Sequence, residues 1–149
     1  MKYDDLINSR RIYREEISGE EVRQAMALAE RDLRAARKIM QDELDWGFAV
    51  GYNAVLQASR AYMFAKGYRP ASAEAHKNTL AFMALALGRK HEALVMYFDR
   101  MRVKRHRAVY DQPGLITRRE ADDLLARAED FVALVRERIG MPELPDEED

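Results

Sequence analysis

Apolar residues recur at helical spacing along most of this chain, in long segments with clear starts and stops. The clearest segment begins after a capping box formed by Thr117 and Glu120, and it ends at Gly140 and Pro142. Several such segments, with no alternating strand pattern of useful length, must bury their apolar stripes helix against helix. The apolar positions of this segment follow the α-helical period: Ala121, Leu124, Leu125, Ala128, Phe131, Val132, Val135 and Ile139.

The same signals predict further helices along the chain. Ser18 caps a helix that extends to about residue 41, and Ser72 caps another over 73–87. A helix over 44–66 ends at Gly67, and one more covers 90–110. A short helix is expected near residues 3–7. We therefore predict an all-α fold, an antiparallel up-and-down bundle of four to five helices.

The bundle is expected to occupy residues 18–140, between a charged N-terminal arm at 1–17 and an acidic tail at 141–149. The helix over 44–66 is apolar around much of its circumference, which is typical of a helix at the centre of a bundle or buried in a dimer. Gly47 and Gly51 weaken this helix relative to alanine and would permit close helix–helix approach. The sequence does not decide whether this helix lies at the centre of the bundle or in a dimer interface.

Composition excludes several classes of site. The chain has 149 residues and no cysteine, so it has no disulfide, zinc–thiolate site or cysteine nucleophile. None of the three histidines has a second histidine one turn away and no Glu-x-x-His occurs, so we expect no protein-held metal and no cofactor. No stretch approaches the length of a membrane span and no apolar signal segment is present, so we expect a cytoplasmic protein without a membrane partner.

Positive charge is concentrated in the helix expected over 90–110. Five of the eight residues from 100 to 107 are Lys or Arg, although the formal net charge of the chain is -1. Arg105 falls near the middle of this helix's apolar stripe, so its guanidinium should point toward the bundle and needs a partner there. That partner could be a ligand phosphate or a carboxylate, either Asp111 or Asp99 of a second copy. The stripe consists of Leu94, Phe98, Met101, Ala108 and Val109.

Arg102, His106 and Tyr110 follow one another at four-residue spacing and form a second stripe beside Arg105. Arginine there could hold a phosphate, while His106 acts as a general acid or base on a ribose hydroxyl. We therefore predict Arg105 and His106 as catalytic residues, and Arg102, Arg105, His106 and Tyr110 as nucleotide- or RNA-binding residues. The alternatives are a buried ion pair for Arg105 and a packing phenol for Tyr110.

At this point the chain resembles the HEPN family of helical nucleotide-binding domains, over most of its length. The resemblance implies a bundle of four to five helices, usually a homodimer whose motif helices pair across a groove. Many members are metal-independent endoribonucleases, often toxins paired with a small nucleotidyltransferase antitoxin. The segments that carry the resemblance are 29–36, 51–55, 67–70, 102–111 and the threonine-capped last helix with 128–131.

The catalytic motif of that family is an arginine, four to six further residues and a histidine. In the family the arginine steadies the scissile phosphate, and the histidine assists attack by the 2′-hydroxyl. Arg100 and His106 have this spacing, but Arg100 falls on the outer side of the helix. Alignment on Arg105 instead puts Tyr110 at the histidine position.

The resemblance therefore implies nucleotide or RNA binding, and it leaves ribonuclease activity open. The alternative is a catalytically inactive structural partner of a nucleotidyltransferase. In some relatives such a partner adenylylates a tyrosine near the motif, and Tyr110 is the nearest candidate here.

Overall fold

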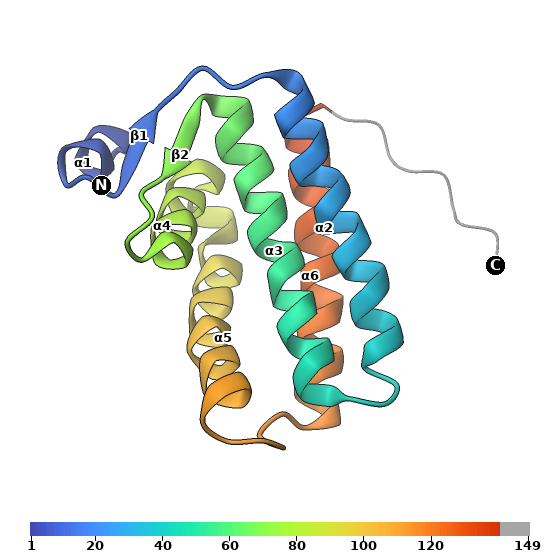
Figure 1. The fold of residues 1–149 in the computed structure, drawn as a ribbon. Helices are drawn as coiled ribbons and strands as arrows, with labels where there is room; N and C mark the ends of the chain where they lie inside the picture. Colours follow the sequence, from blue (N-terminus) through green and yellow to red (C-terminus); the bar gives the residue numbers. More distant parts are fainter. Residues whose placement is uncertain (141–149) are drawn as a thin grey trace.

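The computed structural model describes residues 1–140. Four long helices lie side by side, each antiparallel to the one before it (Figure 1). They are α2 (Gly19–Ile39), α3 (Leu44–Lys66), α5 (Glu92–Tyr110) and α6 (Arg118–Arg138). The shorter α4 (Ala75–Leu87) leads through a 3-10 turn, η1 (Arg89–His91), into α5. The predicted all-α, up-and-down bundle is therefore confirmed.

Helix α3 is the centre of the bundle, because it packs against α2, α4, α5 and α6. Phe48, Tyr52, Val55 and Met63 are completely buried along it. Each large apolar side chain buried in this way contributes roughly 1.5–3 kcal/mol relative to an exposed one. The wide apolar surface of this helix is thus mostly core within a single chain, although Trp46 remains 57% exposed near its start.

Gly47 sets how closely α3 crosses the end of α2. A Cβ built at Gly47 would overlap the side chain of Met40 and lie 2.9 Å from the Met40 backbone nitrogen. A Cβ at Gly51, one turn later, would lie 3.4 Å from the Leu124 side chain, which is a tight but ordinary contact. The close approach expected from these glycines is therefore within the chain, and Gly47 is the position that needs it.

Most predicted helix ends agree with the structure. Helix α3 has the predicted bounds, and Gly67 ends it in the left-handed conformation, with a φ of 83°. Ser18 caps α2 by accepting a hydrogen bond from the Glu21 amide, and Thr117 caps α6 in a full capping box. The predicted helix over 90–110 is regular only from Glu92, because residues 89–91 form the 3-10 turn.

The cap predicted at Ser72 is wrong. Helix α4 begins at Ala75, and its N-cap residue is Glu74, which has a φ of 56° and makes no capping side-chain hydrogen bond. The buried side chain of Asn78 holds the preceding turn instead. Its Nδ2 donates to the carbonyl oxygen of Ala73 at 2.8 Å, while its Oδ1 accepts from Arg11 Nε at 2.9 Å.

The structure also contains a strand pair that the sequence does not predict. Strand β1 (Ile12–Arg14) pairs antiparallel with β2 (Tyr68–Pro70), with Ile12 opposite Pro70. Each strand has three residues, which is too short to produce an alternating pattern. The pairing holds the N-terminal segment and its helix α1 (Tyr3–Asn8) against the bundle, where Leu6 and Ile12 are buried (Figure 1).

The acidic tail expected at 141–149 lies outside the described residues. Within residues 1–140, no helix has both the length and the apolar character needed to cross a membrane.

Candidate functional site

The start of α4 and the second half of α5 together form a surface hollow of about 370 Å³. We call it the basic hollow. Three of the predicted binding residues, Arg102, Arg105 and His106, meet there, although the fourth, Tyr110, does not line it. Among residues 1–140, Glu74 is the only carboxylate that lines it. The lining residues are Ser72, Glu74, Ala75, His76, Lys77, Arg102, Arg105 and His106.

Arg105 lies partly buried in this wall, as its place on the apolar stripe predicts. Its Nε is buried and has no hydrogen-bond partner among residues 1–140. The guanidinium carbon lies 5.7 Å from the centre of the Tyr52 ring, so a cation–π contact offsets part of the desolvation cost. The Asp99 carboxylate pairs with Arg102 instead, because its Oδ1 accepts from Arg102 Nε at 3.0 Å and no ion pair joins it to Arg105 among residues 1–140.

Tyr52 of α3 forms a neutral surface beneath the hollow. Its hydroxyl is buried and, in the described part of the chain, has no hydrogen-bond partner. Burial raises the pKa of Tyr52 far above its ordinary value, although the charges of Arg102 and Arg105 lower it in part. The phenol therefore stays protonated and contributes a ring face rather than a charge.

His76 is a residue of the hollow that the sequence does not assign to it. It lies in the first turn of α4, and its ring centre is 6.1 Å from that of Tyr52. Partial burial, followed by the positive charges of Arg105 and Arg102, lowers the pKa of His76 below its ordinary value. A signal for it did exist, since His76, Leu80, Met83 and Leu87 share one helical face and the last three are buried.

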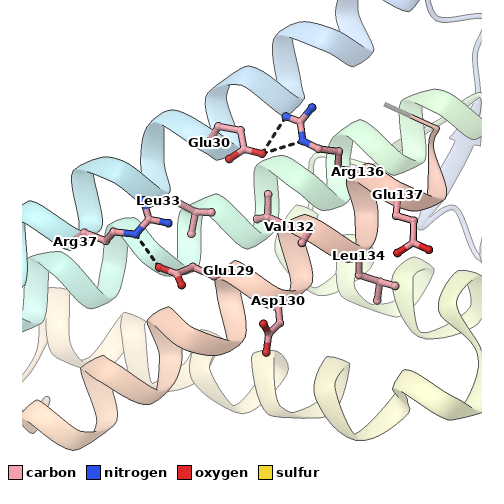
Figure 2. Close-up of a pocket in the computed structure, with 10 residues that line it drawn as sticks. Glu30, Leu33, Arg37, Glu129, Asp130, Val132, Leu134, Arg136 and Glu137 are labelled. Carbon is pink, nitrogen blue, oxygen red and sulfur yellow. Dashed lines mark hydrogen bonds and ion pairs between the residues drawn. The ribbon is translucent and has the colours of Figure 1, made fainter. Parts of the chain in front are cut away.

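A larger groove, of about 580 Å³, lies between α2 and α6 (Figure 2). Its two arginines are engaged with acids, because Arg37 Nε donates to Glu129 at 2.7 Å and Arg136 donates to Glu30 at 2.9 Å. Asp130 and Glu137 also line it, so carboxylates outnumber cations in its wall (Figure 2). This groove is therefore less suited to a phosphate than the basic hollow, despite its size.

One comparison with known proteins identified a family. The model of the HEPN domain family matches residues 22–138, which extends from α2 to the end of α6. The chain belongs to the HEPN family. Both helices that line the basic hollow fall inside the matched region, whereas α1 and β1 precede it. The search for similar curated proteins found no match.

Two residues of the HEPN motif alignments, Tyr110 at the histidine position and Arg100 at the family spacing from His106, lie outside the basic hollow. Tyr110 is 68% exposed, and its ring centre lies 4.9 Å from that of His106. The predicted stripe of Arg102, His106 and Tyr110 therefore exists, with Tyr110 beyond the edge of the hollow. Arg100 is exposed and does not line the hollow either. This HEPN domain thus brings Arg105 and His106 together without a histidine at position 110.

Two other cations of the basic stretch have partners on the surface of the bundle. Lys104 forms an ion pair with Glu120 at the start of α6, and Arg107 donates to Gln112 Oε1 at 3.0 Å. The cations that line the hollow beside Arg105 are therefore Arg102 of α5 and Lys77 of α4.

Proposed function

We propose that this HEPN domain binds RNA or a nucleotide by holding a phosphate in the basic hollow. The observation that carries the proposal is Arg105, a partly buried guanidinium whose Nε lacks a hydrogen-bond partner within residues 1–140. A phosphate oxygen would supply the charge-assisted hydrogen bonds that the protein does not. Arg102 and Lys77 add positive charge in the same wall, and Glu74 is the one opposing carboxylate.

We further propose that the reaction is metal-independent cleavage of single-stranded RNA. Arg105 would neutralise charge on the scissile phosphate, and His106 would transfer a proton as the 2′-hydroxyl attacks and the 5′-oxygen leaves. The support is that His106 lines the same hollow as Arg105 from the next position of α5. Tyr110, outside the hollow, would have no direct part in the reaction.

A homodimer is part of the proposal. Met96, Val103 and Tyr110 stand seven residues apart on α5 and are 54%, 50% and 68% exposed. Apolar residues at this interval form one stripe along a helix, and such a stripe is commonly covered by a second helix. We propose that a second copy of the chain covers it, so that the two α5 helices and their basic hollows lie close together.

The second candidate is a catalytically inactive partner of a nucleotidyltransferase, as in a toxin–antitoxin pair. The observation that favours it is the exposed phenol of Tyr110 at the motif's histidine position. Under this alternative the chain would lack ribonuclease activity, and Tyr110 would be available for adenylylation.

The experiment is incubation of the purified protein with a mixed RNA pool in the presence of EDTA, beside Arg105→Ala and His106→Ala. Arg100→Ala is the matched control, because Arg100 lies on the same helix outside the hollow. The proposal expects RNA binding that Arg105→Ala loses and cleavage that both hollow variants lose, with Arg100→Ala unchanged. Full binding by Arg105→Ala would reject the basic hollow as the binding site.

A further inference from the structure

We infer that His76 is a second acid–base residue of the basic hollow, working with His106 on the same RNA phosphodiester. The inference rests on the proposed ribonuclease function and names a catalytic residue outside the HEPN motif. It comes from α4, a helix that supplies no residue to that motif.

The first observation is that two imidazoles from different helices line one hollow. His76 enters from α4 and His106 from α5, and Arg102 and Arg105 line the same space. His76 and Arg105 both lie against the Tyr52 ring, at 6.1 Å and 5.7 Å from its centre. His76 is therefore held beside the guanidinium that would bind the phosphate.

The second observation is that His76 also lines a neighbouring hollow of about 380 Å³ between α3 and α4. Asn53, Gln57 and Thr79 supply polar groups there, and Ala75 and His76 form the wall that the two hollows share. A phosphate in the basic hollow with its nucleoside in the neighbouring one would place a ribose at this wall. His76 is the titratable group of the shared wall.

The chemistry needs two proton-transfer groups. The 2′-oxygen attacks phosphorus, a base removes its proton and the new O2′–P bond forms. The P–O5′ bond then breaks as an acid protonates the departing 5′-oxygen, which leaves a 2′,3′-cyclic phosphate and a 5′-hydroxyl. Arg102 and Arg105 would neutralise the nonbridging oxygens. No other reactant is required. His76 and His106 together supply the base and the acid, whereas Tyr110 lies outside the hollow.

The surroundings of His76 favour the role of base. Partial burial and the charges of Arg105 and Arg102 lower the pKa of His76, so the ring is neutral and able to accept a proton at pH 7. His106 is then the acid. The charged and titratable groups that line the two hollows around His76 are Tyr13, Arg60, Arg69, Glu74, Lys77, Arg102, Arg105 and His106. Tyr52 lines neither hollow, and its ring packs against the ring of His76.

The test is cleavage of a short single-stranded RNA in EDTA by the full chain and its His76→Ala variant. We expect about a hundredfold or greater loss of cleavage rate, the usual contribution of a positioned acid or base. RNA affinity should stay within about threefold, because the neutral ring contributes no charge to phosphate binding. His91→Ala is the matched control, since this third histidine lines neither hollow.

The pH profile adds a readout that a packing role would not change. The wild-type cleavage rate should fall at a pH below the ordinary histidine value of about 6.5, because the lowered pKa of His76 moves its protonation further into the acid range. That limb should be absent from His76→Ala, and added imidazole should restore part of its activity. His76→Gln, which keeps a polar side chain of similar length, controls for folding and should be equally slow.

Three results would overturn the inference. The first is cleavage by both His76 variants at the wild-type rate. The second is a loss of RNA affinity in these variants that is as large as their loss of cleavage rate. The third is a wild-type protein that binds RNA through Arg105 and does not cleave it, which would leave the binding function standing. If the wild type neither binds nor cleaves, the proposed function itself fails.

Discussion

At the residue scale, Arg105 and Tyr52 have polar atoms buried in positions where the described chain gives them no hydrogen bond. An unsatisfied buried polar group costs roughly 1–3 kcal/mol relative to a paired one. The two residues are in contact, and both belong to the surroundings of the basic hollow. We propose that a phosphate ligand offsets this cost at Arg105 by accepting hydrogen bonds from its guanidinium. We expect that the hydroxyl of Tyr52 has no structural role.

Replacement of Tyr52 by phenylalanine tests the second point. Tyr52→Phe removes only the unpaired hydroxyl, so the free energy of unfolding should be unchanged or higher by up to about 1 kcal/mol. Tyr52→Ala also removes the buried ring and should lower it by about 3–5 kcal/mol. Urea denaturation measures both values. A decrease of more than about 1 kcal/mol in Tyr52→Phe would mean that the hydroxyl does have a partner.

His76 should also contribute to the pH dependence of stability. Because folding lowers the pKa of His76, the unfolded chain binds this proton more readily, and stability should fall as pH drops through about 6.5. His76→Gln removes this contribution and should lose less stability on acidification than the wild type. Urea midpoints near pH 7.5 and near pH 5.5 provide the comparison. An equal loss in the two proteins would contradict the lowered pKa.

The sequence predicted some residues of the hollow and not others for a physical reason. The inward direction of Arg105 follows from the period of one helix, which is a local property. The position of His76 beside Arg105 depends on the height at which α4 crosses α5, and this is set by packing against α3. Tyr52 lies on the helix over 44–66, whose wide apolar surface is visible in the sequence, but its contact with Arg105 is a tertiary relation too.

At the scale of the elements, the contact between α2 and α3 depends on a missing side chain. Gly47→Ala should lower the free energy of unfolding by about 1–3 kcal/mol, because the new methyl group overlaps Met40 and its backbone. Gly51→Ala is the control, since its Cβ fits at 3.4 Å and alanine favours the helix by up to about 1 kcal/mol. Chemical denaturation of both variants measures the difference. Equal stabilities would show that α2 can shift away from α3 without cost.

The helices were predictable because their signals are local, whereas the strand pair and the start of α4 were not. Ser18, Thr117 and Gly67 act on their own neighbours in sequence. Strand β1 pairs with β2 across more than fifty residues of chain, and Asn78, which holds the turn before α4, accepts a hydrogen bond from Arg11 of the N-terminal segment. These features depend on contacts that no sequence window contains.

At the scale of the whole molecule, the proposed homodimer makes a direct prediction. Val103→Arg places a charge in the middle of the exposed stripe of Met96, Val103 and Tyr110, and it should convert a dimer into a monomer. Trp46→Ala is the control, because Trp46 is equally exposed on a different helix. Size-exclusion chromatography with light scattering gives the masses. A wild-type protein that is monomeric at all concentrations, or a Val103→Arg variant that stays dimeric, would contradict the prediction.

Charge is distributed unevenly over the molecule, and this distinguishes the α2–α6 groove from the basic hollow. The groove between α2 and α6 pairs its arginines with carboxylates, whereas the basic hollow keeps Arg105 unpaired by any carboxylate in the described chain (Figure 2). A chain with a net charge of -1 can therefore still concentrate positive charge at the proposed phosphate site.

The most direct test of that claim is the salt dependence of affinity for a fluorescent single-stranded RNA. Wild type, Arg105→Ala and Arg37→Ala, the last from the α2–α6 groove, would be compared between about 50 and 200 mM salt. We predict that Arg105→Ala binds at least about tenfold more weakly, with a log–log slope shallower by about 0.7, the value for one lost phosphate contact. Arg37→Ala should match the wild type. Unchanged affinity and slope in Arg105→Ala, with weakened binding in Arg37→Ala, would contradict the account.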